Sequence, residues 1–375
     1  MKEGEDLPRP DQIEGAAHPA ETLRLFGHQQ AEAQFLESVA AGRLHHAWRL
    51  TGPRGIGKAT LAWRIARFLL RENAGDELFG PPTSLDVPQD DPVARRMRAG
   101  AESRLFVLRR AYDEKAKRLK TVITVDEVRR LKSFFSLSAA DGGHRVVIVD
   151  AADEMNTAAA NALLKQLEEP PAATTLLLVN HQPSALLPTL RSRCRELRLS
   201  PLDSGAMSAA LTEAGLDPGE ETPALTALSA GSVGAAIRLV NLGGIARYAD
   251  LVRLLESLPG LDRPRAMKLA DSVAGAQNVE RLDLLIELLD LLLSRLSRTG
   301  ATGAPPSPEA APGEGAVFTR LCPNPHSARV WATLAQDVGG RLRHGRAVNL
   351  DPAALMLDTI FKLQRTASED ATGAA

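Results

Sequence analysis

The order of apolar and polar residues divides the chain near residue 200. Before that point, short continuous apolar runs alternate with segments in which apolar residues recur at helical spacing. Short apolar runs between turns are typical of strands buried on both faces of a parallel sheet. This alternation predicts an α/β domain with a parallel sheet over residues 21–200. The expected strands are 47–50, 105–108, 145–150 and 175–180, and the expected helices are 29–41, 58–70, 125–136 and 158–168.

Beyond residue 200 the strand pattern disappears. Residues 201–245 show short helical patterns separated by Gly and Pro, and residues 246–375 show longer amphipathic ones. We expect a small helical domain followed by an all-α domain, in which the Ala-, Gly- and Pro-rich stretch 299–315 is a flexible loop. The tail after residue 365 is expected to fray. The expected helices of the last domain are 248–258, 262–273, 279–297, 327–343 and 353–364.

Composition and charge restrict the possible functions more than they restrict the possible folds. The 375 residues suffice for two or three domains, and 45 basic against 46 acidic residues restrict nucleic-acid binding to a local patch. Cys194 and Cys322 are too few for a disulfide framework or a zinc site, which fits a reducing, cytoplasmic setting. Residues 1–20 are polar and acidic, so we expect a disordered tail and no signal peptide. No apolar run is long enough to span a membrane, so no membrane partner is expected.

A glycine-rich loop lies between the first predicted strand and the helix that follows it. The loop reads GPRGIGK over residues 52–58, and Gly52, Gly55 and Gly57 permit backbone angles that side chains would forbid. Backbone N–H groups at a helix N-terminus, together with Lys58, predict a phosphate-binding loop, and an ordinary turn is the less favoured interpretation. A Ser or Thr hydroxyl normally follows the lysine and binds Mg²⁺, but Ala59 stands there.

The strand 145–150 ends in a second nucleotide-site candidate, Asp150. In nucleotide-hydrolysing α/β proteins an aspartate at this place helps to hold Mg²⁺. The next position, where a carboxylate usually activates water, is Ala151. Asp153 and Glu154 lie further along, and we interpret them as charges that complement a helix N-terminus. The two missing groups indicate that hydrolysis was lost while the scaffold was kept.

Three further motifs complete an ordered set. They are the helix NALLKQLEEPP at 161–171, Asn180 at a strand end, and Ser-Arg-Cys at 192–194. The arginines alone also fit a solvated cluster. Together with the phosphate loop and Asp150, however, the set resembles the clamp-loader branch of the AAA+ proteins. This resemblance covers nearly the whole chain from Phe26 onward, and NALLKQLEEPP with Ser-Arg-Cys is its specific part.

The resemblance implies an AAA+ P-loop module over 21–200, a small helical lid over 201–245 and a helical collar over 246–375. In this family, subunits join through their collars into a pentameric ring, and ATP binds between subunits. The arginine of Ser-Arg-Cys reaches the ATP of the next subunit, so Arg193 is implied to be an arginine finger that acts in trans. A guanidinium suits this role because it stays charged and can bridge two phosphate oxygens.

The resemblance also implies a subunit without ATP turnover of its own. Ala59 and Ala151 replace two catalytic groups, and Gly234 takes the place of a lid arginine that reads the γ-phosphate. Such a subunit works within a DNA-directed DNA polymerase holoenzyme in DNA replication. Its direct partners are motor and delta-type loader subunits, and its indirect partners are the sliding clamp and primer-template DNA. The degenerate nucleotide site comprises Gly52, Gly55, Gly57, Lys58, Asp150 and Asn180.

No cofactor is expected to be required, and binding of ATP with Mg²⁺ at the degenerate loop stays open. Family members often carry a four-cysteine zinc module after the phosphate-loop helix. Residues 72–104 contain no Cys, so we expect neither zinc nor another metal. Cys194 is interpreted as a packing residue.

Two other functions compete with this interpretation. An active AAA+ ATPase, either a clamp-loader motor or a branch-migration motor, is opposed by Ala59, Ala151 and Gly234. A small-molecule P-loop kinase leaves Ser-Arg-Cys and the helical C-terminal region unexplained.

Two surface features each allow two interpretations. Arg129, Arg130 and Lys132 lie on one predicted helix and form either a DNA-contacting or a solvated face. Residues 282–296, apolar on more than one face, form either a core helix or part of a subunit interface, together with 353–364.

Overall fold

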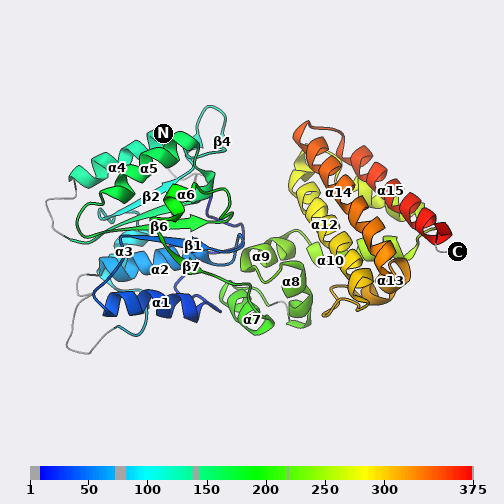
Figure 1. The fold of residues 1–375 in the computed structure, drawn as a ribbon, viewed down its shortest axis with the longest axis horizontal. Helices are drawn as coiled ribbons and strands as arrows, with labels where there is room; N and C mark the ends of the chain where they lie inside the picture. Colours follow the sequence, from blue (N-terminus) through cyan, green and yellow to red (C-terminus); the bar gives the residue numbers. More distant parts are fainter. Residues whose placement is uncertain (1–8, 72–81, 138–142, 218, 374–375) are drawn as a thin grey trace. The chain divides into compact units, whose positions relative to one another are not determined.

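The computed structural model describes residues 9–137, except 72–81, and residues 143–373, except 218. The chain divides into two compact units, drawn in Figure 1. Unit 1 comprises Met1–Asp217 and Gly231–Ile237, and unit 2 comprises Pro218–Ala230 and Arg238–Ala375. The predicted lid, 201–245, is thus shared between the units. Its separation from the collar stays a prediction.

Unit 1 contains a five-stranded parallel sheet, which confirms the predicted α/β class. The central strands β5, β6 and β1 are buried at every position because helices cover both faces. This burial explains why their sequences are continuous apolar runs and do not alternate. In spatial order the strands are β2 (Leu105–Arg109), β5 (Arg145–Asp150), β6 (Thr174–Asn180), β1 (Ala47–Thr51) and β7 (Arg195–Arg198).

Helices flank both faces of this sheet. Figure 1 shows α4 and α5 on one side and α2 and α3 on the other. Asn156 caps α5, since its Oδ1 accepts a hydrogen bond of 2.9 Å from the Ala159 N–H. The helices of this unit are α1 (Gln29–Ala40), α2 (Lys58–Leu70), α3 (Pro92–Arg98), α4 (Val125–Leu137), α5 (Thr157–Glu168), α6 (Pro188–Arg191) and α7 (Ser204–Glu213).

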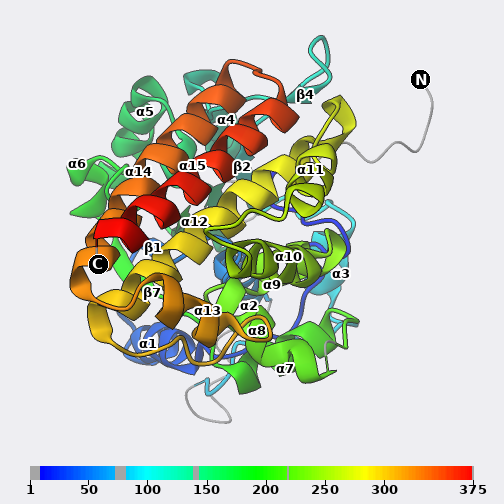
Figure 2. The same cartoon turned by 90° about the vertical axis from the view of Figure 1, so that its right-hand side faces the viewer.

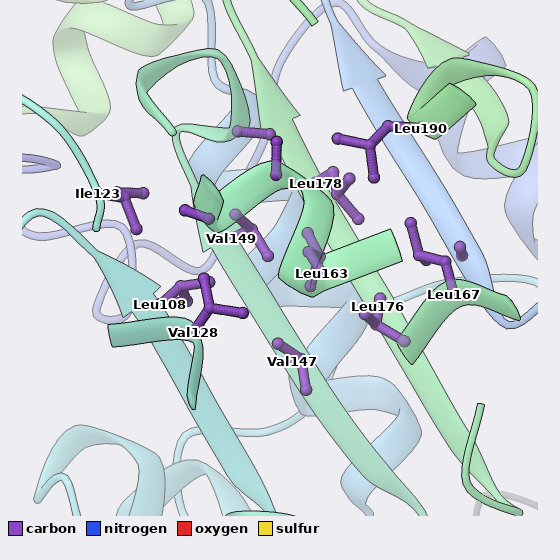
Figure 3. Close-up of a cluster of buried hydrophobic side chains, with 14 of the residues drawn as sticks. Leu108, Ile123, Val128, Val147, Val149, Leu163, Leu167, Leu176, Leu178 and Leu190 are labelled. Carbon is purple, nitrogen blue, oxygen red and sulfur yellow. The ribbon is translucent and has the colours of Figure 1, made fainter. Parts of the chain in front are cut away.

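One hydrophobic core cluster of unit 1 lies between the sheet and the pair α4 and α5 (Figure 3). Val147 and Val149 of β5 and Leu176 and Leu178 of β6 point into it, because alternate residues of a strand share one face. Helix side chains fill the other half, among them Leu163 of α5. This packing fixes the strand ends at which the candidate site lies.

Two strand features were not predicted. β7 reads Arg-Glu-Leu-Arg, in which Leu197 alone is buried, so it carries no apolar run. It lies at an edge of the sheet, where one partner strand and one covered face are enough. β3 (Tyr112–Asp113) and β4 (Arg118–Leu119) form a short antiparallel hairpin, for which the sequence offers only charged turn residues.

The prediction of a disordered tail over 1–20 is wrong for residues 9–20. These residues belong to the fold, and their polar side chains Asp11 and His18 are 1% and 3% exposed. The sequence prediction failed because it assumed that a polar segment stays in water, whereas here the polar groups pair with one another. Residues 1–8 and 72–81, the latter within the expected loop 72–104, lie outside the described residues.

Unit 2 is all-helical in its described residues, as predicted. α12, α14 and α15 lie side by side in Figure 2. The leucines of α12, except the half-buried Leu291, are buried within this unit, which supports the interpretation of 282–296 as a core helix. Helix α9 (Val233–Asn241) begins in unit 1 and ends in unit 2. The other helices are α8 (Thr222–Leu228), α10 (Gly244–Glu256), α11 (Arg263–Asp271), α12 (Val279–Thr302), α13 (Glu314–Leu321), α14 (Pro325–Ala347) and α15 (Pro352–Gly373).

The prediction of a flexible loop over 299–315 is also wrong. α12 continues to Thr302, and the following stretch is fixed by Glu314, whose side chain is 0% exposed. The Glu314 carboxylate accepts hydrogen bonds from Arg295 Nε (2.7 Å), Tyr248 Oη (2.5 Å) and the Ala310 N–H (2.6 Å). The expected fraying after residue 365 is wrong as well, because α15 runs to Gly373.

Among the described residues, no single helix has the length and apolar composition needed to cross a membrane. One strongly bent helix pair, Gly219–Leu228 with Val233–Asn241, passes that test by length and composition only.

Candidate functional site

The phosphate loop lies where the sequence predicted it, between the end of β1 at Thr51 and the start of α2 at Lys58. Gly52, Gly55 and Gly57 all have positive φ angles. Asp150 and Asn180 end β5 and β6, and Asn180 pairs in register with Thr51. Since carboxyl ends of parallel strands meet at one edge of a sheet, the structure brings all six predicted nucleotide-site residues together.

Lys58 is turned back onto its own loop. Its side chain donates from Nζ to the carbonyl oxygens of Gly52, at 2.6 Å, and of Pro53. Burial lowers the pKa of Lys58 to about 8, against the opposing attraction of Asp150 and Asp153. These two carbonyl groups occupy two of the three N–H donors of the ammonium group, so a phosphate would have to compete with them for Lys58.

The Asp150 carboxyl group ionises less readily in this setting than an exposed aspartate does. Burial raises its pKa to about 7, and the nearby carboxylates of Asp11 and Glu154 add to the effect. Oδ2 of Asp150 and both polar side-chain atoms of Asn180 are buried without a hydrogen-bond partner among the described residues. Such orphaned groups mark the site as one that is still polar.

Asp153 and Glu154 do not act as helix N-terminal charges, which corrects that interpretation. They lie in a short 3₁₀ turn before α5 begins. Asp153 Oδ1 accepts a hydrogen bond of 2.8 Å from the His181 N–H. Glu154 pairs with Arg110 at 2.6 Å. Neither carboxylate therefore replaces the missing base at Ala151.

A turn at the start of α9 closes against the phosphate loop. The Gly234 N–H donates to Gly55 O at 2.8 Å, and Ser232 Oγ donates to Arg54 O at 2.8 Å. A Cβ atom on Gly234 would lie 2.9 Å from Gly55 Cα and 2.6 Å from Ile13 Cδ1. The place that the family resemblance assigns to a lid arginine therefore has no room for a side chain.

Arg193 lies in the turn between α6 and β7. Its side chain is 38% exposed, with Nη2 2.9 Å from Glu168 Oε1 and Nη1 donating to Thr189 O at 3.0 Å. These contacts hold the guanidinium at the surface, apart from the phosphate loop.

The comparisons with known proteins agree with this arrangement. A family model described as "DNA polymerase III, delta subunit" matches residues 27–203, which include both the phosphate loop and Arg193. Residues 27–203 are thus similar to this family.

Two delta-prime subunits of DNA polymerase III are similar to this chain. The one from Pseudomonas aeruginosa is 38% identical over 229 residues, which cover 60% of this chain and 65% of the relative. The one from Escherichia coli K12 is 35% identical over 207 residues, which cover 55% and 58%. The chain thus spans less than two thirds of the length of either relative.

A solved gamma-subunit-related protein of DNA polymerase III from Thermotoga maritima is 17% identical to this chain. The superposition covers 89% of this chain and 99% of that protein, with a TM-score of 0.36. This similarity is too low to indicate function.

Two other predictions concern Cys194 and the basic residues of α4. Burial raises the pKa of the Cys194 thiol to about 11, and its side chain packs against the core of unit 1, so it is a packing residue. On α4, Arg129 pairs with Asp126 at 2.9 Å while both side chains stay exposed, which fits a solvated face. DNA contact by Arg130 and Lys132, which are also exposed, stays a prediction.

Asp11, His18 and Arg109 are site residues that sequence reasoning missed. Asp11 Oδ1 accepts a hydrogen bond of 2.9 Å from Arg109 Nη1, and Asp11 Oδ2 lies 2.9 Å from His18 Nε2. Arg109 ends β2, beside Asp150 at the end of β5. No local pattern signals this cluster, because Asp11 and Arg109 are 98 positions apart.

The donor set of this site lacks one of the usual Mg²⁺ ligands. The Ser or Thr hydroxyl is replaced by Ala59, whose side chain offers no oxygen to a metal ion. In the described part of the chain, no group of three or more His, Cys, Asp or Glu side chains is placed to hold a metal ion.

Proposed function

We propose that this chain is a non-motor subunit of the DNA polymerase III clamp loader, corresponding to delta-prime. It supplies Arg193 to the ATP site of a neighbouring subunit and helps to load the sliding clamp onto primed DNA. One observation carries the proposal. The chain presents an exposed arginine in the family's Ser-Arg-Cys turn, while its own phosphate loop is closed and lacks catalytic groups.

The geometry of the chain's own site argues against an ATPase motor. Turnover of ATP needs a bound metal ion and a positioned water. Ala59 and Ala151 provide neither function, and Lys58 is occupied by its own loop. The same features argue against a small-molecule kinase, which needs the metal ion as well.

The surroundings of Arg193 suit a group that acts on another molecule. An exposed ion pair contributes about 0–1 kcal/mol, so the pair with Glu168 can yield to a more highly charged phosphate. The hydrogen bond from Nη1 to Thr189 O is likewise a single contact at the surface, which bidentate bonds from the guanidinium to a phosphate would replace. Arg193 therefore completes a site that this chain does not itself contain.

The partners belong to the same proposal. Motor and delta-type loader subunits are the direct partners, and the clamp and primer-template DNA are reached through them. Unit 2 carries exposed apolar side chains suited to subunit contact, among them Met267 (50% exposed), Leu350 (53%) and Phe361 (49%). A cytoplasmic location and the absence of a required cofactor follow from this function.

The test is reconstitution with the other loader subunits and the clamp, followed by Arg193→Ala. We expect the variant to assemble normally but to lower the clamp- and DNA-stimulated ATPase by at least about tenfold, since a trans arginine contributes about 10³–10⁵ in rate at a single site. Arg191→Ala is the matched control, because this neighbouring arginine is also exposed. Full ATPase activity of the Arg193 variant, or failure of the unaltered chain to co-purify with loader subunits, would overturn the proposal.

A further inference from the structure

The segment from Arg9 to Ala20 crosses the edge of the sheet at which the phosphate loop lies. Its first contact is the Asp11 carboxylate, which is 1% exposed and accepts a hydrogen bond from Arg109 at the end of β2. Asp11 is also close enough to Asp150 to oppose the ionisation of that group. The segment thus places a second carboxylate beside the aspartate of the candidate nucleotide site.

The next contact is with Gly234, which itself touches the phosphate loop. Ile13 Cδ1 occupies the space into which a side chain on Gly234 would project. Gly234 in turn approaches Gly55 so closely that a Cβ on Gly55 would lie 3.0 Å from Gly234 Cα. Ile13, Gly234 and Gly55 therefore form one packed layer, in which the apolar side chain comes from the segment.

The far end of the segment is anchored to α2, the helix that begins at the phosphate loop. His18 Nε2 lies 2.9 Å from Asp11 Oδ2. The His18 ring packs edge-on against the Trp63 ring, with the two ring centroids 5.7 Å apart. Its Nδ1 accepts a hydrogen bond of 3.0 Å from the Ala20 N–H. Arg67 donates to Ala20 O at 2.8 Å. These contacts favour one defined path for the segment.

We propose that residues 9–20 are an intramolecular plug of the phosphate-loop site, which keeps nucleotide out until the segment is displaced. Ile13 excludes volume, and Asp11 pairs with the Arg109 guanidinium, so that this cation at the end of β2 is not available to phosphate groups. The orphaned polar atoms of Asp150 and Asn180 beneath show that the site keeps its polar character. A ligand that binds only the open form has an apparent affinity reduced by the small open fraction. This inference rests on the proposed function only in taking the loop as a degenerate nucleotide site.

The test measures binding of a fluorescently labelled ATP, with Mg²⁺ and with EDTA, to the purified full chain. We expect no saturable binding by the unaltered chain at up to about 1 mM nucleotide, and a dissociation constant at least about tenfold lower for Asp11→Ala/Ile13→Ala. Adding Lys58→Ala to the double variant should abolish the gained binding. Gln12→Ala, which truncates an exposed side chain in the same segment, should behave like the unaltered chain.

Equal affinity in the unaltered chain and the double variant would overturn the inference, and so would absence of binding by a double variant with a native circular dichroism spectrum. If the double variant does not fold, Ile13→Ala alone, which keeps both contacts of Asp11, must show the gain in affinity. No partner subunit and no contact of Arg193 enters this assay. Loss of the proposed function in reconstitution would therefore leave its result unaffected.

Discussion

At the scale of single residues, the candidate site is dominated by ionisable groups held away from water. Lys58 and Asp150 both have pKa values displaced toward neutrality, chiefly because burial disfavours their charged forms. Two such groups side by side are typical of functional sites, but structural burial gives the same displacement. Ala59 and Ala151 lack the catalytic groups. Under the proposed function, this favours a site that kept its ionisable residues and lost its catalytic partners.

Asp150→Asn should stabilise unit 1 at neutral and alkaline pH. The pKa of Asp150 is about 7 in the folded chain against an ordinary value of 3.8, so folding favours the protonated form and stability falls as pH rises between these values. The amide of Asn does not ionise, so the variant does not lose stability in this way. We expect a gain of more than about 1 kcal/mol at pH 8 and none at pH 3.5, measured by urea unfolding.

Asp126→Asn is the control for this pH effect, because the Asp126 side chain is 77% exposed. It should shift the urea midpoint little at either pH. A stability gain for Asp150→Asn that is the same at both pH values would contradict the assigned cause.

At the scale of elements, buried polar networks fix the conformation of segments that composition alone would predict to be flexible. The stretch before α13 is rich in Ala, Gly and Pro, yet Glu314 binds it to Arg295 of α12 and Tyr248 of α10. Burial and the Glu314 carboxylate together raise the pKa of Tyr248 above its ordinary range, so the phenol stays a hydrogen-bond donor. One buried carboxylate thus joins three elements of unit 2.

Glu314→Ala should destabilise unit 2 by about 3–5 kcal/mol, because removing one partner of a buried ion pair leaves Arg295 uncompensated. The loss is measured by urea unfolding, followed by the helical circular dichroism signal. Glu287→Ala is the matched control, since its pair with Arg238 is exposed and contributes less than about 1 kcal/mol. Equal losses in the two variants would show that the network does not anchor the loop.

At the scale of the whole molecule, the proposed function depends on association with other subunits. Most apolar residues of α12 face the interior of unit 2, so this helix is not the surface left for partners. α15 differs, because Phe361 is 49% exposed. A large exposed aromatic side chain is a common centre of a protein–protein contact.

Phe361→Ser should weaken loader assembly without lowering the melting temperature of the isolated chain. An exposed side chain adds little to folding, so the stability change should stay within about 0.5 kcal/mol. Assembly is followed by analytical size-exclusion chromatography with the partner subunits. Arg365→Ala, an exposed polar change on the same helix, should leave assembly intact. Normal assembly by the Phe361 variant would place the interface elsewhere.

The sequence by itself determined the parts of this protein that depend on local patterns. Continuous apolar runs identified β5 and β6 because both faces of those strands are buried, and glycines before a helix identified the phosphate loop. Arg193 was found through a motif, and its proposed role still depends on a partner.

Only the tertiary structure decided the contacts between distant positions. It turned Lys58 onto its own loop, packed Ile13 against Gly234, and joined Asp11 to Arg109. Polar residues 9–20 suggest a solvated tail until their partners are known. The physical reason is that hydrophobic periodicity records which face is buried but carries no information about which distant charge or side chain lies opposite.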